Sequence, residues 1–175
     1  MSSEAWYVPL LNSIPSGLIG AGVVYYFGLR QRAKERRFAF LDRQLTEFYA
    51  PLAGLRKQIR ATSELRLKVI NVTSFSAERT EATIDYHNKQ FHEELMPKYR
   101  EMLTLFTNKY HLADADTRAF YSPFLEYVEI WNMWLAKSLE PDVPSKLGHA
   151  EENVKPFYAH LEAKMQALQD EIARG

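Results

Sequence analysis

The stretch AWYVPLLNSIPSGLIGAGVVYYFGLRQRAKERR, from Ala5 to Arg37, decides the architecture of this chain. Its first part, Ala5 to Leu29, contains no charged residue. As a helix that rises about 1.5 Å per residue, Leu10 to Leu29 would cover roughly 30 Å, the thickness of the hydrocarbon core of a bilayer. The sequence therefore predicts one N-terminal transmembrane helix. A basic cluster follows it directly, made of Arg30, Arg32, Lys34, Arg36 and Arg37.

This basic cluster predicts the orientation of the span, because Lys and Arg next to a transmembrane helix stay on the cytoplasmic side. We therefore expect three regions: residues 1–29 as an N-terminal segment with the transmembrane helix, residues 30–40 as a basic juxtamembrane segment, and residues 41–175 as a cytoplasmic body. The N-terminus would lie outside. The lipid bilayer is the first expected partner, and the basic cluster would also contact anionic lipids.

A cleaved signal peptide and an interfacial or soluble helix are the two alternatives to a transmembrane helix. A cleaved signal peptide would need basic residues before its apolar core, whereas Met1 to Tyr7 carries only Glu4 as a charged residue. An interfacial or soluble helix stays open as the second alternative. Prolines and polar residues dilute the first half of the apolar stretch, namely Pro9, Asn12, Ser13, Pro15 and Ser16.

Small residues recur every four positions in the predicted span. Ser13, Gly17 and Ala21 form one row, and Ser16 and Gly20 form a second row beside it. Small residues at this spacing let helix backbones approach closely inside lipid. The pattern predicts a homo-oligomer that packs through its span, for example as a ring. Glycine and serine are also common in membrane helices, so the pattern by itself leaves both interpretations open.

Length and composition limit what the rest of the chain can be. The chain has 175 residues, enough for one domain besides the anchor. Its 22 basic residues equal its 22 acidic residues, so no overall field attracts nucleic acid, and nucleic-acid binding is expected to be weak at most. The sequence has no cysteine, which excludes disulfides and thiolate metal sites.

Beyond residue 40, apolar residues recur three and four positions apart, as in packed helices. The first helix is expected along a seam of apolar residues, where Pro51 kinks it or begins a new helix. The next helix is expected to begin at Ser74 or Ser76. Further helices are expected from Pro97 to Tyr110, over about 117–139, and over about 153–173. No stretch alternates as a strand does. The fold class is therefore all-α, an up-and-down helical bundle behind the transmembrane helix. The first seam contains Leu41, Leu45, Phe48, Leu52, Leu55 and Ile59.

The segment around residues 117–139 is the most aromatic part of the chain and is expected to be the central helix. Asp114 or Asp116 would cap its N-terminus, and Pro123 would bend it. Residues 140–148 contain two prolines and a glycine and are expected to form the longest loop.

One pair of residues has catalytic potential. Lys155 and His160 lie five positions apart at the start of the last helix, where Pro156 favours a first-turn position. The imidazole could move a proton of a phosphodiester while the cation stabilises the developing negative charge. A structural histidine beside Leu161 and an ordinary surface lysine explain the same residues. His87 and His92 would diverge on a helix, so no metal site and no cofactor are expected.

The layout of the chain and the Lys155–His160 spacing resemble the small membrane accessory proteins encoded beside RNA-targeting type VI-B CRISPR nucleases. That resemblance implies a HEPN-like helical domain, a pore-like ring in the bacterial inner membrane, a role in antiphage defence and an RNA-guided nuclease or other defence protein as partner. HEPN ribonucleases carry an Arg-x(4–6)-His motif late in the domain. Lysine replaces the arginine here, and it lacks the planar fork that grips a phosphate at two points.

These observations favour a membrane-anchored, self-associating helical protein that acts on membrane integrity, without enzymatic activity. The first alternative is a membrane-tethered HEPN-like ribonuclease that uses Lys155 and His160. The second is an adaptor that holds a cytoplasmic partner at the membrane.

Overall fold

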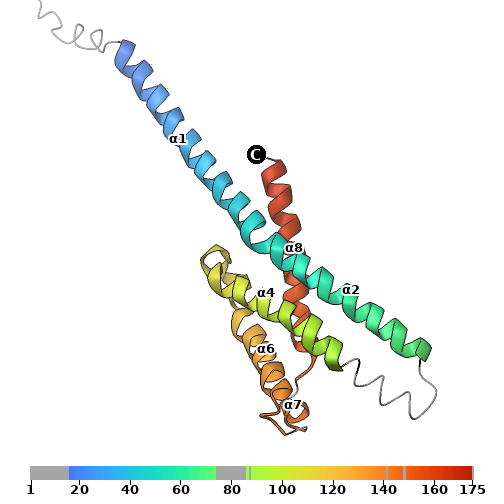
Figure 1. Cartoon of the computed structure of the whole chain (residues 1–175). Helices are drawn as coiled ribbons and strands as arrows, with labels where there is room; N and C mark the ends of the chain where they lie inside the picture. The colour runs from blue at the N-terminus through green and yellow to red at the C-terminus, as the bar shows by residue number, and fades with distance from the viewer. Residues whose placement is uncertain (1–15, 74–85, 87, 141, 148, 175) are drawn as a thin grey trace, which may run out of the picture. The chain divides into compact units, whose positions relative to one another are not determined.

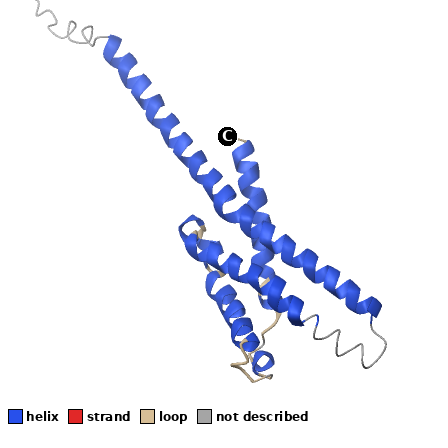
Figure 2. Cartoon of the chain, in the orientation of Figure 1, coloured by secondary structure: helices blue, strands red, loops and turns tan. Residues whose placement is uncertain are grey.

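The computed structural model of the chain describes residues 16–73, 86, 88–140, 142–147 and 149–174. All regular elements in these ranges are helices or helical turns, and no strand occurs among them (Figure 2). The all-α prediction is therefore confirmed. The chain divides into two compact units, Met1–Phe40 and Leu41–Gly175, which are described separately below.

Helix α1 spans Ser16–Gln44, so it contains the second half of the apolar stretch and the whole basic cluster (Figure 1). Among the described residues, no helix has an apolar stretch of the length that a membrane span requires. The predicted span begins at Leu10, and its residues 10–15, including Ser13, lie outside the described residues.

The second unit is a bundle in which α2 packs against α4 and α8, and α4 also packs against α6 (Figure 1). The bundle begins with the π-helical turn η2, which leads directly into α2, and a second π turn, η3, precedes α4. Its elements are η2 (Leu45–Tyr49), α2 (Ala50–Thr73), η3 (Phe91–Leu95), α4 (Met96–Asn108), η4 (Tyr110–Leu112), α5 (Ala115–Arg118), α6 (Tyr121–Leu135), α7 (Val143–Lys146), η5 (Glu151–Asn153) and α8 (Lys155–Ala173).

Both π turns end two residues before a proline. The turn η2 ends at Tyr49, two positions before Pro51, and η3 ends at Leu95, two positions before Pro97. A proline has no backbone N–H and its ring clashes with the carbonyl four residues earlier, which favours a wider turn at that point. The expected break at Pro51 therefore takes the form of a π turn, after which α2 begins.

The predicted seam supplies much of the core. Phe48, Leu52 and Ile59 are fully buried, and Leu41 and Leu55 are nearly so. From the last helix, Phe157 and Leu161 are also buried. The ring of Phe106 joins these helices, since its centroid lies 5.4 Å from that of Phe48 and 5.5 Å from that of Phe157. Each such buried side chain contributes about 1.5–3 kcal/mol to folding.

The structure corrects the expectation of one helix over residues 117–139. The chain forms the short helix α5, which ends at Arg118, and then α6, which ends at Leu135. Lys137 has a φ of 56°, a left-handed conformation that stops the helix. Pro123 lies in the first turn of α6, where its missing N–H has no intrahelical partner to lose, so proline is accommodated without a break.

The structure also tests the loop expected over residues 140–148 and the last helix. The segment 140–148, expected as a loop, contains the one-turn helix α7, whose second residue is Pro144. The last helix is confirmed, since α8 begins at Lys155 with Pro156 in its first turn. The helix start expected at Ser74 or Ser76 lies outside the described residues.

Candidate functional site

Helix α1 carries a band of exposed aromatic residues followed by a band of exposed basic residues. Tyr25 is 69% exposed, and Tyr26 and Phe27 are each 61% exposed. The side chains of the basic cluster, Arg30, Arg32, Lys34, Arg36 and Arg37, are all exposed as well. The aromatic band therefore precedes the basic band along the helix axis.

The basic cluster surrounds the helix instead of forming one face. At about 100° per residue, Arg32 projects roughly 200° away from Arg30, whereas Lys34 returns to within about 40° of it. Arg36 lies near Arg32, and its Nε donates to the Arg32 carbonyl at 3.2 Å. The Lys34 ammonium lies 5.7 Å from the ring centroid of Phe38. The cations thus project from two opposite sides of α1, and these five residues are called the collar below.

Four of the small residues that predict self-association, Ser16, Gly17, Gly20 and Ala21, lie in helix α1. Their four-residue spacing places Gly17 and Ala21 on one face of the helix, with Ser16 and Gly20 on an adjacent face. The residue that begins the first row, Ser13, precedes the described part of the chain.

The two candidate catalytic residues have separate partners in the structure. The Lys155 ammonium donates to Oε1 of Glu152 at 2.7 Å on the surface. The Nε2 atom of His160 instead lies 2.8 Å from Oγ1 of Thr117, and its ring packs 5.2 Å from that of Phe120. The ribonuclease hypothesis requires both side chains at one phosphate, and no contact in the described part of the chain brings them together.

His160 belongs to a polar cluster that the sequence did not reveal, the Asp114 cluster, formed by Tyr49, Asp114, Thr117, His160 and Lys164. Oγ1 of Thr117 is its centre. This atom lies 2.7 Å from Oδ1 of Asp114 and 2.8 Å from the hydroxyl of Tyr49. Oδ1 of Asp114 also accepts from the Thr117 backbone N–H at 2.8 Å, which makes Asp114 the N-cap of α5. The sequence offered Asp114 or Asp116 as the cap of a longer helix over about 117–139.

The proton positions in this cluster follow from the acceptors. A carboxylate only accepts, so Thr117 donates its hydroxyl proton to Asp114. The two lone pairs of Thr117 Oγ1 then accept from the Tyr49 hydroxyl and from Nε2–H of His160. The Tyr49 oxygen in turn accepts from the backbone N–H of Asp114 at 3.3 Å. The hydroxyl of Thr117 is fully used, and His160 has its proton on Nε2.

Electrostatics reinforce the same arrangement. Burial raises the pKa of Asp114, but the ion pair with Lys164 and the bonds from Thr117 outweigh this, and the pKa falls to about 2. The hydrogen bond to Asp114 raises the pKa of Lys164. Burial raises the pKa of the Tyr49 phenol. Asp114 and Lys164 are therefore both charged at neutral pH.

The Asp114 cluster joins three segments instead of presenting a reactive group. Tyr49 comes from η2, Thr117 from α5, and His160 and Lys164 from α8. Tyr49 and Thr117 are both 0% exposed, so no substrate reaches the hydroxyl of Thr117. The geometry makes this cluster a tertiary cross-link of the bundle.

A second polar region surrounds Arg56 of α2. Its guanidinium lies 3.8 Å from the ring centroid of Tyr158 and 3.0 Å from Oε1 of Glu151. The Arg56 side chain is only 14% exposed. Burial raises the pKa values of Tyr158 and of the neighbouring Tyr99 and Tyr127. This cation–π contact ties α2 to α8.

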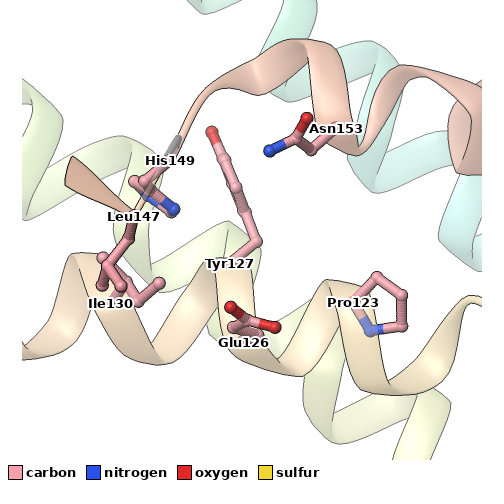
Figure 3. A pocket seen from close by; sticks show the side chains of 7 residues that line it. All are labelled: Pro123, Glu126, Tyr127, Ile130, Leu147, His149 and Asn153. Carbon is pink, nitrogen blue, oxygen red and sulfur yellow. The ribbon is translucent and has the colours of Figure 1, made fainter. Parts of the chain in front are cut away.

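A pocket of about 240 Å³ lies at the end of the bundle where α6 meets the segment before α8 (Figure 3). Figure 3 shows the Tyr127 ring standing between His149 and Asn153, with Glu126 at its foot. The centroids of Tyr127 and His149 are 4.7 Å apart. Its walls are formed by Pro123, Glu126, Tyr127, Ile130, Leu147, His149 and Asn153.

Neither a search for metal ligands in the structure nor comparison with known proteins indicates a further site. Within the described ranges, no three His, Asp or Glu side chains are grouped so that they could hold a metal ion. His92 is exposed on η3, and His87 lies outside the described residues. No protein-family model matches the chain, and neither the curated proteins nor the solved structures contain a match.

Proposed function

We propose that this chain is a membrane-anchored helical protein whose N-terminal part lies in a bilayer. Its basic cluster lies among the lipid headgroups on the cytoplasmic side, and the Leu41–Gly175 bundle lies in the cytoplasm. The observation that supports this proposal is the order of residue classes along α1: the aromatic band at Tyr25–Phe27 comes first, and the collar from Arg30 to Arg37 comes next.

The collar favours a helix that crosses the headgroup layer over one that lies flat on it. A helix parallel to the surface needs its basic residues on one side and its apolar residues on the other. In α1, Arg30 and Arg32 project in roughly opposite directions, so a flat helix would push one of them toward hydrocarbon. A helix along the membrane normal instead spreads these cations over about 10 Å of depth, all on the same side of the aromatic band.

The aromatic band supports the same placement. Tyr25, Tyr26 and Phe27 leave most of their surface uncovered. Aromatic side chains with this exposure are typical of the membrane interface, where the ring is in apolar surroundings and the tyrosine hydroxyl remains hydrated. The uncharged stretch extends N-terminally from this band as far as Ala5.

The proposal includes self-association through the small-residue rows and an action on membrane integrity. The rows of Gly17 with Ala21 and of Ser16 with Gly20 support helix association in lipid. The resemblance to accessory proteins of type VI-B CRISPR loci supports a pore-like assembly in antiphage defence, with an RNA-guided nuclease or another defence protein as partner.

Topology can be tested directly, because the chain has no cysteine to remove. Single-cysteine variants Ser3→Cys and Ser145→Cys would be treated with a membrane-impermeant maleimide in intact cells and after lysis. We expect Ser3→Cys to react in intact cells and Ser145→Cys to react only after lysis. Protein that stays in the supernatant after high-speed centrifugation, free of lipid and detergent, would contradict the proposal.

Self-association has its own test in detergent. Gly17→Leu and Gly20→Leu would obstruct close helix contact, whereas Val24→Leu changes an apolar residue of the same helix by one methylene and serves as the control. We expect a smaller particle by light scattering for the two glycine variants alone. A monomeric wild-type protein at micromolar concentration would refute this part of the proposal.

A further inference from the structure

A short piece of chain beside α6, called the strap below, consists of residues 142–147 and His149 (Figure 3). It contains the one-turn helix α7. The backbone N–H groups of Leu147 and His149 donate to carbonyls inside the strap, and the ion pair between Lys146 and Asp142 also lies inside it. In the described part of the chain, no hydrogen bond or ion pair therefore fixes the strap to α6.

The strap contacts α6 through the imidazole of His149. The centroid of this ring lies 4.7 Å from that of Tyr127 and 5.2 Å from that of Trp131. The other contact is looser, because Leu147 is 56% exposed and a cavity of about 240 Å³ lies between the strap and α6. The position of the strap thus depends on one aromatic side chain that can be protonated.

The surroundings of His149 favour its neutral form. Burial lowers the pKa of the imidazole, which outweighs the opposing effect of the Glu126 carboxylate. The Nε2 atom is buried and has no hydrogen-bond partner among the described residues. In the imidazolium ion this nitrogen would be a buried, positively charged N–H group without water or an acceptor. The Tyr127 ring attracts a cation, but more weakly than an acceptor or water would.

The charged groups around His149 do not supply the missing acceptor. Glu126 is exposed, Asp142 is paired with Lys146, and none of them contacts Nε2. Glu151 is paired with Arg56. The titratable groups on the elements beside His149 are Glu126 and Tyr127 on α6, Asp142 and Lys146 on α7, and Glu151 on η5.

We propose that His149 makes the strap an acid-sensitive latch: protonation of its imidazole releases the strap from α6 while the rest of the bundle stays folded. Release uncovers the rings of Tyr127 and Trp131. This inference goes beyond the proposed function and does not depend on the membrane anchor, because every residue in it belongs to the Leu41–Gly175 unit.

The sign of the pH effect follows from the direction of the shift. In the released strap, His149 regains the ordinary histidine pKa of 6.5, whereas burial lowers its pKa in the closed strap. The closed strap therefore keeps its full stability above about pH 6.5 and loses stability as the pH falls below that value. Asp114, with its folded pKa of about 2, acts only at lower pH.

Amide hydrogen exchange tests the latch in full-length, detergent-solubilised protein at about pH 7.5 and about pH 5.5, with each rate divided by its intrinsic rate at that pH. Leu147 and His149 report on the strap, because a single helical turn does not keep its hydrogen bonds once it is detached. We expect the opening equilibrium of the strap to rise about three- to tenfold at the lower pH, and the amides of α6 to change much less.

His149→Phe is the decisive variant, because it keeps an aromatic ring and cannot be protonated. His111→Phe, exposed on η4, is the matched control. We expect the pH effect to vanish in His149→Phe and to persist in His111→Phe, with unchanged circular dichroism in both. The comparison of the strap with α6 in the wild type does not need either variant. The proposal is overturned by equal opening of the wild-type strap at both pH values, by a pH effect that His149→Phe retains, or by equal opening of α6.

Discussion

The hydroxyl of Tyr49 lies 2.8 Å from Oγ1 of Thr117, although 68 positions separate the two residues in the sequence. Both side chains are fully buried, so water cannot replace this bond when it is broken. Through the same Thr117 oxygen, Tyr49 is connected to Asp114 and His160. The bundle should therefore lose stability when the hydroxyl group of Thr117 is removed.

Thr117→Val tests this dependence, because it keeps the shape of the side chain and removes its hydroxyl. Tyr49, Asp114 and His160 each lose a partner, and we expect a loss of about 2–4 kcal/mol in unfolding free energy. Urea unfolding of the full-length protein measures it. Thr107→Val, on the surface and bonded to Tyr121, is the control and should lose under about 1 kcal/mol. Equal losses would show that Thr117 is not a special position.

Asp114→Asn tests the electrostatic part of the cluster. The folded pKa of Asp114, about 2, lies below its ordinary 3.8, so ionised Asp114 favours the folded state. This contribution is fully present above about pH 4 and is lost as the pH falls toward 2. We expect the unfolding free energy of the wild type, measured by urea unfolding, to exceed that of Asp114→Asn by about 2 kcal/mol at pH 7 and by much less near pH 2.

The control for this experiment is Asp116→Asn, which removes an exposed carboxylate of the same helix. Its stability difference from wild type should be small at pH 7. A difference between wild type and Asp114→Asn that stays constant from pH 7 to pH 2 would contradict the assigned role of Asp114.

His160→Ala and Lys155→Ala should have unequal effects on stability. The first variant removes a ring that packs on Phe120 and bonds to Thr117, and we expect a loss of about 1–3 kcal/mol. The second breaks an exposed pair with Glu152, which is worth about 0–1 kcal/mol. Thermal or urea unfolding distinguishes them. The ribonuclease alternative would instead be favoured if the wild type cleaves RNA and both variants stay folded but do not cleave it.

Arg56→Lys tests the contact with Tyr158. Lysine keeps the charge but lacks the planar group that stacks on the ring, so we expect a loss of about 1 kcal/mol. Arg60→Lys, one turn further along α2 and paired with Glu64 on the surface, is the matched control and should change stability little. If the two variants lose equally, stacking at Arg56 contributes nothing measurable.

The sequence revealed those parts of the fold that depend on local periodicity. Phe48, Leu52 and Ile59 recur at helical spacing and are all buried, as expected. The N-cap role of Asp114 was also predictable, because acceptor side chains before a helix satisfy its first N–H groups. Helix ends were less predictable, since the stop near Lys137 depends on a single left-handed residue.

The polar contacts inside the bundle could not be predicted, because the residues that form them are distant in sequence. Tyr49 is buried next to Phe48, but nothing in the sequence around it indicates which residue its hydroxyl contacts. No local pattern connects Tyr49 with Thr117, or Arg56 with Tyr158. The pocket was missed for another reason: Leu147 lies in segment 140–148, which was expected to be only a loop, and His149 directly follows that segment.

The two π turns have a consequence for how the sequence can change. Each inserts one residue beyond the ordinary helical repeat. The turn η2 ends on the buried pair Phe48–Tyr49, and η3 ends on the buried Leu95, directly before the buried Met96 of α4. Because the wider turn absorbs that residue, deleting a single residue there would restore a regular repeat and leave the following side chains on nearly the same faces. The same deletion within the regular part of α2 or α4 would instead rotate the following side chains by roughly 100°, so the π turns are the points where these helices best accommodate the loss of one residue.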